Sequence, residues 1–307
     1  MDLLSLRYFQ VVARHEHISR AAEELRVAQP SISRTIARLE ADVGVPLFDR
    51  QGRRIRLNRF GAAFLRRVDR ALAELDDARR ELSDAAGLAR GSVSLASETL
   101  LTITEPVKSF IAEHPDVAVR LFQLTPDVMA ERLGEGQVDF CLASEVLDGP
   151  GLDHEELVRE EVLLAVPLGH RLAGRREVTM ADLAGEPVVT TRPGIWQRTL
   201  AERLFSQAGL ELVVACEIDE ATTGIEMVSA GLGVGFGPAW YLRSPLASRA
   251  RFSPVRLAAP GAERVLRLFW REGAYVSEAA RRFRDHLTAS LTEPGHGPGS
   301  ASRPPEA

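Results

Sequence analysis

Residues 17–40 place apolar side chains at the three- and four-residue spacing of an amphipathic helix, and the pattern is interrupted once, at 26–28. The pattern predicts two short helices joined by a tight turn. The first helix is expected to begin at Ser19, whose hydroxyl can accept a hydrogen bond from a free amide of the first turn. The second is expected to begin at Gln29-Pro30, because a proline costs little in the first turn, where its missing N–H would have no partner.

The second of these helices has one apolar side and one polar side. The apolar stripe consists of Ile32, Ile36, Leu39 and Val43. The opposite side carries Pro30, Ser33, Arg34, Ala37 and Arg38. Small residues there permit close approach to DNA, and arginines can bond phosphates or the O6/N7 edge of guanine. The pattern is typical of a recognition helix in the major groove, although an ordinary surface helix with a solvated basic face has the same pattern.

Residues 49–57 follow with charged residues around Gly52 and then with alternating polar and apolar positions. This pattern predicts a small β-hairpin with Gly52 in its turn and with Arg53, Arg54 and Arg56 exposed. A basic hairpin directly after a recognition helix is placed to lie along the phosphate backbone, so we interpret it as a wing.

The distribution of charge supports contact with DNA at the N-terminal end. Residues 1–60 hold 11 Arg against 7 acidic residues, a net charge of +4, whereas the whole chain carries −5, which leaves −9 for the remainder. A basic head on an acidic body suits a protein that touches DNA with one end only.

Five motifs in the first 50 residues resemble the winged-helix pattern of the LysR-type transcriptional regulators. They are Leu6-Arg7-Tyr8-Phe9, Ser19-Arg20-Ala21-Ala22, Gln29-Pro30-Ser31-Ile32-Ser33, Ile36-Ala37-Arg38-Leu39-Glu40 and Gly44-Val45-Pro46-Leu47-Phe48-Asp49-Arg50. The similarity continues in the family's order to about residue 290. Two positions depart from the pattern: Ile18, where the family usually has an aromatic residue, and Ala28, where a Ser commonly precedes Gln-Pro. Together the residues and the resemblance give an expected DNA-binding set of Ser19, Arg20, Gln29, Pro30, Ser31, Ser33, Arg34, Arg38, Arg50, Arg53, Arg54 and Arg56.

A long helix is predicted after the wing, over 61–88, with a narrow apolar seam among Arg, Asp and Glu. The seam consists of Leu65, Val68, Leu72, Leu75 and Leu82, and Arg79 breaks it once. An exposed helix with such a seam requires a partner helix, either from a second copy or from the chain's own body. The resemblance implies a linker helix that pairs with its twin, and a tetramer built from such dimers.

Strands and helices alternate from residue 91 to about 290, which predicts parallel sheets covered by helices. Two such units fit, 91–161 completed by 264–291, and 162–263, with hinges near 143–160 and 259–264. The resemblance implies a two-lobed α/β effector-binding domain of the periplasmic-binding-protein type. The expected organisation is therefore an α/β chain with a winged helix-turn-helix at 1–60, the linker helix at 61–88, two lobes, and a disordered tail rich in Pro, Gly and Ser at 292–307.

Ligands of open α/β lobes bind beyond the carboxyl ends of the strands, often at helix N-termini. Four loops qualify, and they give the expected effector-binding residues Ser97, Glu98, Thr99, Leu124, Thr125, Thr191, Arg192, Phe236 and Gly237. Hydroxyls, free amides and Arg192 could hold a small carboxylate, although each residue could also only cap its loop. Glu98 would repel an anion or would select a cationic or hydroxyl-rich ligand. Trp196 could cover the cleft or belong to the core.

Other classes of protein find little support in the sequence. The chain has no HExxH, no CxxC pair, no GxSxG and no P-loop, and the Gly231–Gly235 run follows a predicted helix where a dinucleotide fingerprint would follow a strand. We therefore expect no enzyme, no metal and no cofactor. Cys141 and Cys216 sit in apolar runs and are expected to be buried thiols; a redox-switch disulfide is the alternative, although nothing in the sequence brings the two together. With no apolar run of about 18 residues and no secretory pattern, we expect a cytoplasmic protein without a membrane partner.

The leading hypothesis is a homo-oligomeric transcription regulator that binds an inverted repeat in double-stranded DNA, works with RNA polymerase, and responds to a small-molecule effector in the cleft. The competing hypotheses are an enzyme or solute-binding protein on the same two-lobed body, and a constitutive DNA-binding protein without an effector. The sequence does not give the effector, the operator, the target genes, the sign of regulation, or the choice between dimer and tetramer.

Overall fold

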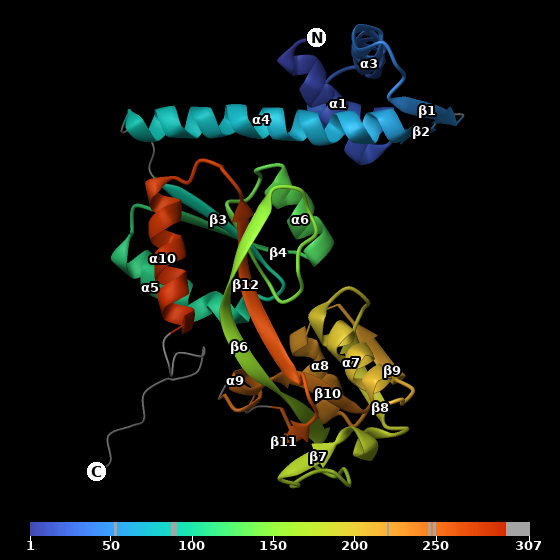
Figure 1. Ribbon diagram of the computed structural model, residues 1–307, viewed down its shortest axis with the longest axis vertical. Coiled ribbons are helices and arrows are strands. Elements are labelled where there is room, and N and C mark those ends of the chain that lie inside the picture. Colours follow the sequence, from blue (N-terminus) through green and yellow to red (C-terminus); the bar gives the residue numbers. More distant parts are fainter. Residues whose placement is uncertain (52–53, 87–90, 220, 245–246, 248–249, 293–307) are drawn as a thin grey trace. The chain divides into compact units, whose positions relative to one another are not determined.

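The computed structural model describes residues 1–292 except 52–53, 87–90, 220, 245–246 and 248–249 (Figure 1). The described chain divides into two compact units, residues 1–86 with 134–137, and the remainder. The expected turn residue Gly52, Arg53 beside it, and nearly all of the expected tail lie outside the described residues.

The first unit consists of three helices, a two-stranded hairpin and a long helix. Its elements are α1 (Leu3–His15), α2 (Ile18–Leu25), α3 (Gln29–Val43), β1 (Phe48–Gln51), β2 (Arg54–Leu57) and α4 (Arg59–Ala85). A shared core brings the first three helices, the hairpin and the start of α4 together, with Phe9 at its centre in contact with the rings of Phe48 and Phe64. The fold is that of a winged helix-turn-helix followed by a helical extension.

The helix pair follows the sequence prediction closely, with one correction at its start. Helix α2 begins at Ile18, and His17 occupies the cap position without a side-chain hydrogen bond. The expected capping role of Ser19 is therefore wrong, because this residue already lies inside the helix; its hydroxyl is 3.4 Å from Gln29 Oε1 instead. Helix α3 begins at Gln29 with the proline in its first turn.

Side chains hold the segments at the two ends of the hairpin by accepting hydrogen bonds from backbone N–H groups. Glu40 of α3 accepts hydrogen bonds from the N–H groups of Leu47 (2.7 Å) and Phe48 (3.2 Å). Asn58 caps α4 by accepting from the first-turn amides of Phe60 and Gly61, both at 2.9 Å. Gly61 is required here, because a Cβ at this position would lie 2.1 Å from the carbonyl oxygen of Leu47.

Helix α4 divides its apolar seam between two environments. Val68 and Leu72 are buried in the core of the first unit, and Leu65 packs against the same core. Leu75 and Leu82 farther along are 41% and 71% exposed. The expectation that all five seam residues serve pairing with a second copy is thus corrected: the first three pack within their own unit, because that part of the helix lies over α1 and the hairpin.

The second unit is built on a mixed sheet whose path runs β4-β3-β5-β12-β6-β10-β8-β9, with β11 paired to β6 and β7 paired to β11. The strands are β3 (Ser92–Ser97), β4 (Ala118–Gln123), β5 (Phe140–Ala143), β6 (Leu152–Pro167), β7 (Glu177–Thr179), β8 (Pro187–Thr191), β9 (Val213–Ile218), β10 (Val234–Pro238), β11 (Phe252–Ala258) and β12 (Glu263–Arg271). The helices are η1 (Leu101–Ile103), α5 (Thr104–Glu113), α6 (Pro126–Gly134), η2 (Met180–Leu183), α7 (Trp196–Gln207), α8 (Ala221–Ser229), α9 (Ala239–Leu242) and α10 (Glu278–Thr292).

Strand β6 joins the two halves of this unit. We call them lobe 1, which contains β3, β4, β5 and their helices, and lobe 2, which contains β8, β9, β10 and their helices. Strand β6 pairs with β12 over its first part and with β10 and β11 over its second part (Figure 1). The pairs that include β6 are all antiparallel, as is β12 with β5. The expectation of purely parallel sheets is therefore correct only for the strand pairs within each lobe.

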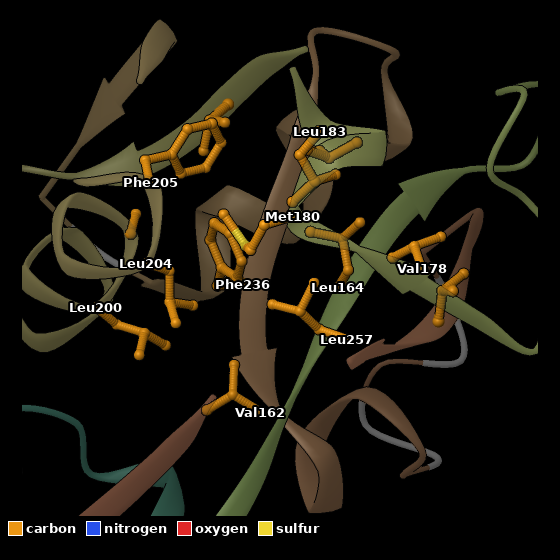
Figure 2. Packing of buried hydrophobic residues seen from close by; sticks show 14 of the residues in the cluster. Val162, Leu164, Val178, Met180, Leu183, Leu200, Leu204, Phe205, Phe236 and Leu257 are labelled. Carbon is orange, nitrogen blue, oxygen red and sulfur yellow. The ribbon is translucent and has the colours of Figure 1, made fainter. Parts of the chain in front are cut away.

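Alternation along the strands decides which helix covers which face. In lobe 2, Val162, Leu164 and Val166 of β6 face a core shared with α7 (Figure 2). The residues between them, Leu163 and Ala165, face the opposite core with α8. In lobe 1, α5 and α10 cover one face and α6 the other. Both lobes are thus three-layered, with helices on both sides of the sheet.

Among the described residues, no helix is both long and apolar enough to cross a membrane.

Candidate nucleic-acid interface and ligand cavity

The outer face of α3 is polar, basic and open to solvent. Ser33, Arg34, Ala37 and Arg38 are exposed, as are Gln29 and Pro30 at the start of the helix. Ile32, Ile36 and Leu39 are buried on the opposite face, as the spacing predicts, and Val43 packs against the same core. Burial of one face holds the helix on the unit and leaves the side chains of the other face free to enter a groove.

The two arginines of this face differ in their surroundings. Arg34 donates from Nε to the carbonyl oxygen of Pro30 at 3.3 Å. Arg38 lies near the carboxylates of Asp2 and Asp42. The pKa of Asp42 is lowered first by its hydrogen bond to the N-terminal ammonium group and to a smaller extent by Arg38. Acidic residues therefore lie near Arg38, whereas Arg34 donates to a backbone carbonyl oxygen of its own helix.

The other expected DNA contacts are placed as follows. Arg20 is exposed, and Ser19 and Ser31 are half-buried. In the hairpin, Arg56 of β2 is exposed. Arg50 and Arg54 belong to paired strands, but their side chains lie outside the described part of the structure, as does the whole of Arg53.

The second unit contains a cavity where lobe 1 meets lobe 2. Its larger part has an empty volume of about 410 Å³, including space open to solvent, and is lined mainly by aromatic and aliphatic side chains: Trp196, Phe236, Trp240, Tyr241, Leu101 and Ile225, with Thr99, Gln197, Gly237, Pro238 and Arg264. A smaller part, with an empty volume of about 280 Å³ that also includes space open to solvent, is lined by residues of lobe 2 and shares Gln197, Ile225 and Phe236 with the larger part. The smaller part adds Thr190 and Thr191.

The cavity collects four of the nine residues expected to bind an effector. Thr99, Thr191, Phe236 and Gly237 line it. Ser97 is buried and donates from its hydroxyl to the carbonyl oxygen of Thr99 at 2.9 Å, so it shapes the loop. Leu124, Thr125 and Arg192 are not among the lining residues of either part.

Arg192 in particular does not occupy the role that the sequence suggests. Its side chain is 45% exposed and its Nε lies 3.2 Å from Asp219 Oδ1. It also lies near Asp127, whose pKa is lowered first by a hydrogen bond from the hydroxyl of Thr125 and to a smaller extent by Arg192. The positive charge of this arginine is already balanced by Asp219 of lobe 2 and Asp127 of lobe 1.

Arg264 is the cation that does line the cavity, and the sequence analysis missed it. Its Nε donates to Ser144 Oγ at 2.8 Å and its Nη1 to Glu160 Oε1 at 3.2 Å. Its guanidinium group also stacks on the ring of Trp196. Nothing in the sequence pattern marks Arg264, because its partners Ser144 and Glu160 come from distant parts of the chain.

Glu98 continues this network. Its Oε2 accepts from Ser144 N (2.9 Å) and Ser144 Oγ (2.7 Å). Burial raises the pKa of Glu98, and the charge of Arg264 and the Ser144 hydrogen bonds oppose that rise. Burial also raises the pKa values of Glu145 and Glu160 nearby. The surroundings of Arg264 are therefore rich in carboxylates.

Several buried polar atoms around the cavity have no hydrogen-bond partner among the described residues. They are Thr190 Oγ1, Thr191 Oγ1, Gln197 Oε1 and Trp240 Nε1 on its walls, with Glu98 Oε1 in the adjoining network. A buried polar group without a partner is costly, and native structures keep few of them. Their concentration at one cavity indicates a place built to receive a ligand.

The described part of the chain contains no candidate metal site. No group of three or more His, Cys, Asp or Glu residues there could hold a metal ion. Cys141 is buried, and burial raises the pKa of its thiol, whereas Cys216 is half-buried; both are free.

A winged helix-turn-helix joined to a two-lobed body with a ligand cavity defines a ligand-responsive DNA-binding protein. Residues 3–62 match the family model described as bacterial regulatory helix-turn-helix protein, lysR family, and residues 86–292 match that of the LysR substrate binding domain. The chain belongs to the LysR family of DNA-binding transcription regulators, whose members carry an effector-binding domain.

Individual relatives and solved structures agree with this assignment. The chain is 34% identical to the uncharacterized HTH-type transcriptional regulator YybE of Bacillus subtilis (strain 168), over 95% of this chain and 100% of the relative. It is 32% identical to YnfL of Escherichia coli (strain K12), over 95% and 99%. Full-length CbnR complexed with its target DNA matches with a TM-score of 0.54 at 26% identity, over 95% and 100%. A full-length OxyR variant from Pseudomonas aeruginosa has the same fold, with a TM-score of 0.69 at 19% identity over 99% of both chains.

Proposed function

We propose that this regulator binds an imperfect inverted repeat in promoter DNA as an oligomer, and that a small molecule in the cavity between lobe 1 and lobe 2 controls it. Helix α3 enters the major groove, the β1-β2 hairpin lies along the backbone, and α4 pairs with the α4 of a second copy. The protein works in the cytoplasm together with RNA polymerase.

The observation that carries this proposal is the polar outer face of α3. Ser33, Arg34 and Arg38 are exposed on a helix whose other face is fixed in a core. Arginine can bond guanine bidentately, and serine can accept or donate to any base edge, so the face is suited to reading sequence. The +4 charge of residues 1–60 adds attraction to the phosphates. CbnR, which has been crystallised on its target DNA, aligns over 95% of this chain.

The exposed leucines of α4 support an oligomer. Leu75 and Leu82 lie beyond the part of the helix that packs in its own unit. Two paired heads would present two copies of α3 to half-sites one or more helical turns of DNA apart.

The cavity supports control by an effector. A ligand that fits one arrangement of lobe 1 and lobe 2 better than another shifts the population between them, and the shift can reach the DNA-binding heads through the oligomer.

A genome-wide pull-down with the purified protein tests the proposal. We expect strong enrichment of one or a few intergenic fragments that share an imperfect inverted repeat, and loss of this enrichment with Arg34→Ala. Uniform recovery of genomic DNA by both proteins, at several salt concentrations, would contradict sequence-specific regulation. Salt is varied because the non-specific part of the affinity falls steeply with it.

A further inference from the structure

We propose that the effector is an uncharged, amphipathic molecule of about one aromatic ring, with a neutral head that both donates and accepts hydrogen bonds, and that carboxylates of the same size are rejected. This inference rests on the proposed function, because it names the class of ligand for the same cavity.

The larger part of the cavity determines the apolar end of this ligand. Trp196, Trp240 and Phe236 contribute faces and edges to its wall, and Tyr241, Leu101 and Ile225 complete it. Aromatic rings prefer offset-stacked or edge-to-face neighbours, which a ligand ring would supply. Because the empty space of about 410 Å³ includes open solvent, it is an upper limit on the volume of the ligand, and one aromatic ring lies within that limit.

The smaller part of the cavity determines the polar end of the ligand. Thr190, Thr191 and Gln197 are 3%, 2% and 7% exposed, and each has a side-chain oxygen without a partner among the described residues. Hydroxyl groups can donate or accept, whereas the carbonyl oxygen of Gln197 only accepts. A head that carries both a donor and an acceptor satisfies all three with the Gln197 amide as it stands, whereas a carboxylate, which only accepts, requires this amide to turn and present its NH₂ group.

The charge around the cavity argues against an anion as well. Among the described residues, no ionisable side chain lines the smaller part. In the larger part the charge of Arg264 is already shared by Glu160 and by the Trp196 ring, and Glu98 lies one hydrogen bond farther, beyond Ser144. Arg192, the other candidate for a carboxylate, is engaged by Asp219 and lies outside the lining. A buried carboxylate head would therefore lack a free counter-charge.

Three probes of matched size test the inference: phenylacetamide (neutral), phenylacetate (anion) and 2-phenylethylamine (cation). Binding is followed by the fluorescence of the tryptophans on titration of the purified full-length protein without DNA, because Trp196 and Trp240 line the cavity and Trp270 lies in lobe 1. We expect phenylacetamide to bind at least about tenfold more tightly than either charged probe, the effect of one unmatched buried polar group. Phenylacetate binding as tightly as phenylacetamide, 2-phenylethylamine binding more tightly, or no response to phenylacetamide up to its solubility limit would each overturn the inference.

A matched pair of variants localises the effect. Thr191→Val removes a partnerless hydroxyl from the cavity wall, and we expect it to weaken phenylacetamide about three- to tenfold. Thr102→Val removes a hydroxyl that is equally buried and partnerless but is not among the lining residues, and we expect no change in affinity. Equal affinities for the two variants would overturn the placement of the ligand head. DNA binding is measured separately by fluorescence anisotropy, so a failure of the regulator proposal and a failure of the ligand class give different results.

Discussion

The guanidinium group of Arg264 lies over the indole ring of Trp196, 4.8 Å from its centroid. Arg264 comes from β12, near the point where β6 and β12 pass from lobe 1 to lobe 2, and Trp196 opens the first helix of lobe 2. The same arginine donates to Ser144 at the end of β5 and to Glu160 of β6. One buried cation thus connects the cavity wall, the crossing strands and lobe 1.

Replacing Arg264 with methionine is expected to destabilise the protein by about 3–5 kcal/mol, because removing one partner of a buried ion pair leaves the other charge without compensation. Glu160 and Glu98 would both lose the arginine that favours their ionised forms. Urea unfolding of the full-length chain, followed by circular dichroism, measures the change.

Arg256→Met is the control for this prediction. Arg256 pairs with Glu161 and Glu177, but its side chain is 62% exposed. Exposed pairs contribute about 0–1 kcal/mol, so the control variant should unfold close to the wild type. Equal losses of unfolding free energy for the two variants would mean that the buried network around Arg264 stabilises the protein no more than an exposed ion pair does.

Glu98 gives the protein a pH dependence of defined sign. Burial raises its pKa in the folded state above the ordinary value of 4.5, so the charged form costs stability. The stability linked to Glu98 is therefore greatest below that ordinary value and falls as the pH rises through the higher folded pKa. The groups that surround Glu98 are Ser144, Arg264 and Glu145.

Glu98→Gln should remove part of this fall. The amide oxygen can take the place of Oε2 on Ser144, and the NH₂ group can take the place of the partnerless Oε1. Urea midpoints measured from pH 4.5 to 8 should show the variant gaining on the wild type as the pH rises. Glu105→Gln, which alters an exposed carboxylate paired with Lys108, should run parallel to the wild type. A Glu98→Gln curve parallel to the wild type would show that the pKa of Glu98 is the same in the folded and the unfolded chain, and would contradict the prediction.

The first unit could be predicted from the sequence in most respects, since its elements are specified by neighbours along the chain. The position of Pro30 and the stripe from Ile32 to Val43 fix where α3 begins and which face it buries. The hairpin follows from charges and alternation around Gly52, and its strands pair as expected. The start of α2 was missed by one residue, within the uncertainty of helix boundaries.

The second unit was less predictable where strands break local rules. The first part of β6, from Leu152, is rich in acidic residues, and Glu156 and Glu160 there pair with Arg267 and Arg264 of β12. So many charged positions hide the alternation that marks a strand. Strand β11 contains Pro254, which usually argues against a strand interior. The residue pattern alone therefore does not reveal the first part of β6 or any of β11.

The cavity was predictable in position but not in chemistry. The carboxyl ends of β8 and β10 bring Thr191, Phe236 and Gly237 to it, as the rule for α/β sheets predicts. Arg264 meets Ser144 across 120 residues of chain, a contact that only the tertiary structure creates. Arg192 was given an anion-binding role because the sequence does not reveal that Asp219 lies beside it.

Ala28 occupies the N-cap position of α3 with extended backbone angles and without a side-chain hydrogen bond. Ala28→Ser should stabilise the DNA-binding unit by about 0.5–1 kcal/mol, because a serine hydroxyl there can accept from the N–H of Ser31. That amide already bonds to the carbonyl oxygen of Ala28 at 2.9 Å, so the gain is at the low end of the usual range. Ala37→Ser, in the exposed middle of the same helix, should give no gain. Thermal unfolding of both variants decides whether the cap position is responsible.

The division of the α4 seam predicts two different phenotypes. Leu72→Ala should cost about 2–5 kcal/mol of stability, because the side chain is buried in the core of the first unit. Leu82→Glu should leave unfolding almost unchanged, since the leucine is 71% exposed, and should weaken self-association instead. Sedimentation velocity over a range of protein concentrations separates these effects. A Leu82→Glu protein with the association state of the wild type would remove this part of α4 from the pairing surface.

Arg34 and Arg56 are expected to contribute to DNA binding in different ways. Arg34 projects from the outer face of α3, so Arg34→Ala should cost about 1–3 kcal/mol at the specific site and much less on random DNA. Arg56 is exposed on β2, where it faces no base in the proposed geometry, so Arg56→Ala should weaken both DNAs alike and lower the slope of log affinity against log salt by about 1. Anisotropy titrations of both variants on the enriched fragment and on a scrambled fragment, at four salt concentrations, measure these quantities.

Equal losses of affinity on both fragments for Arg34→Ala would show that this arginine binds phosphate, and the reading of sequence would then fall to Ser33 and Arg38. An unchanged salt slope for Arg56→Ala would take the β2 strand of the hairpin out of the contact surface, leaving α3 to account for the electrostatic part of binding.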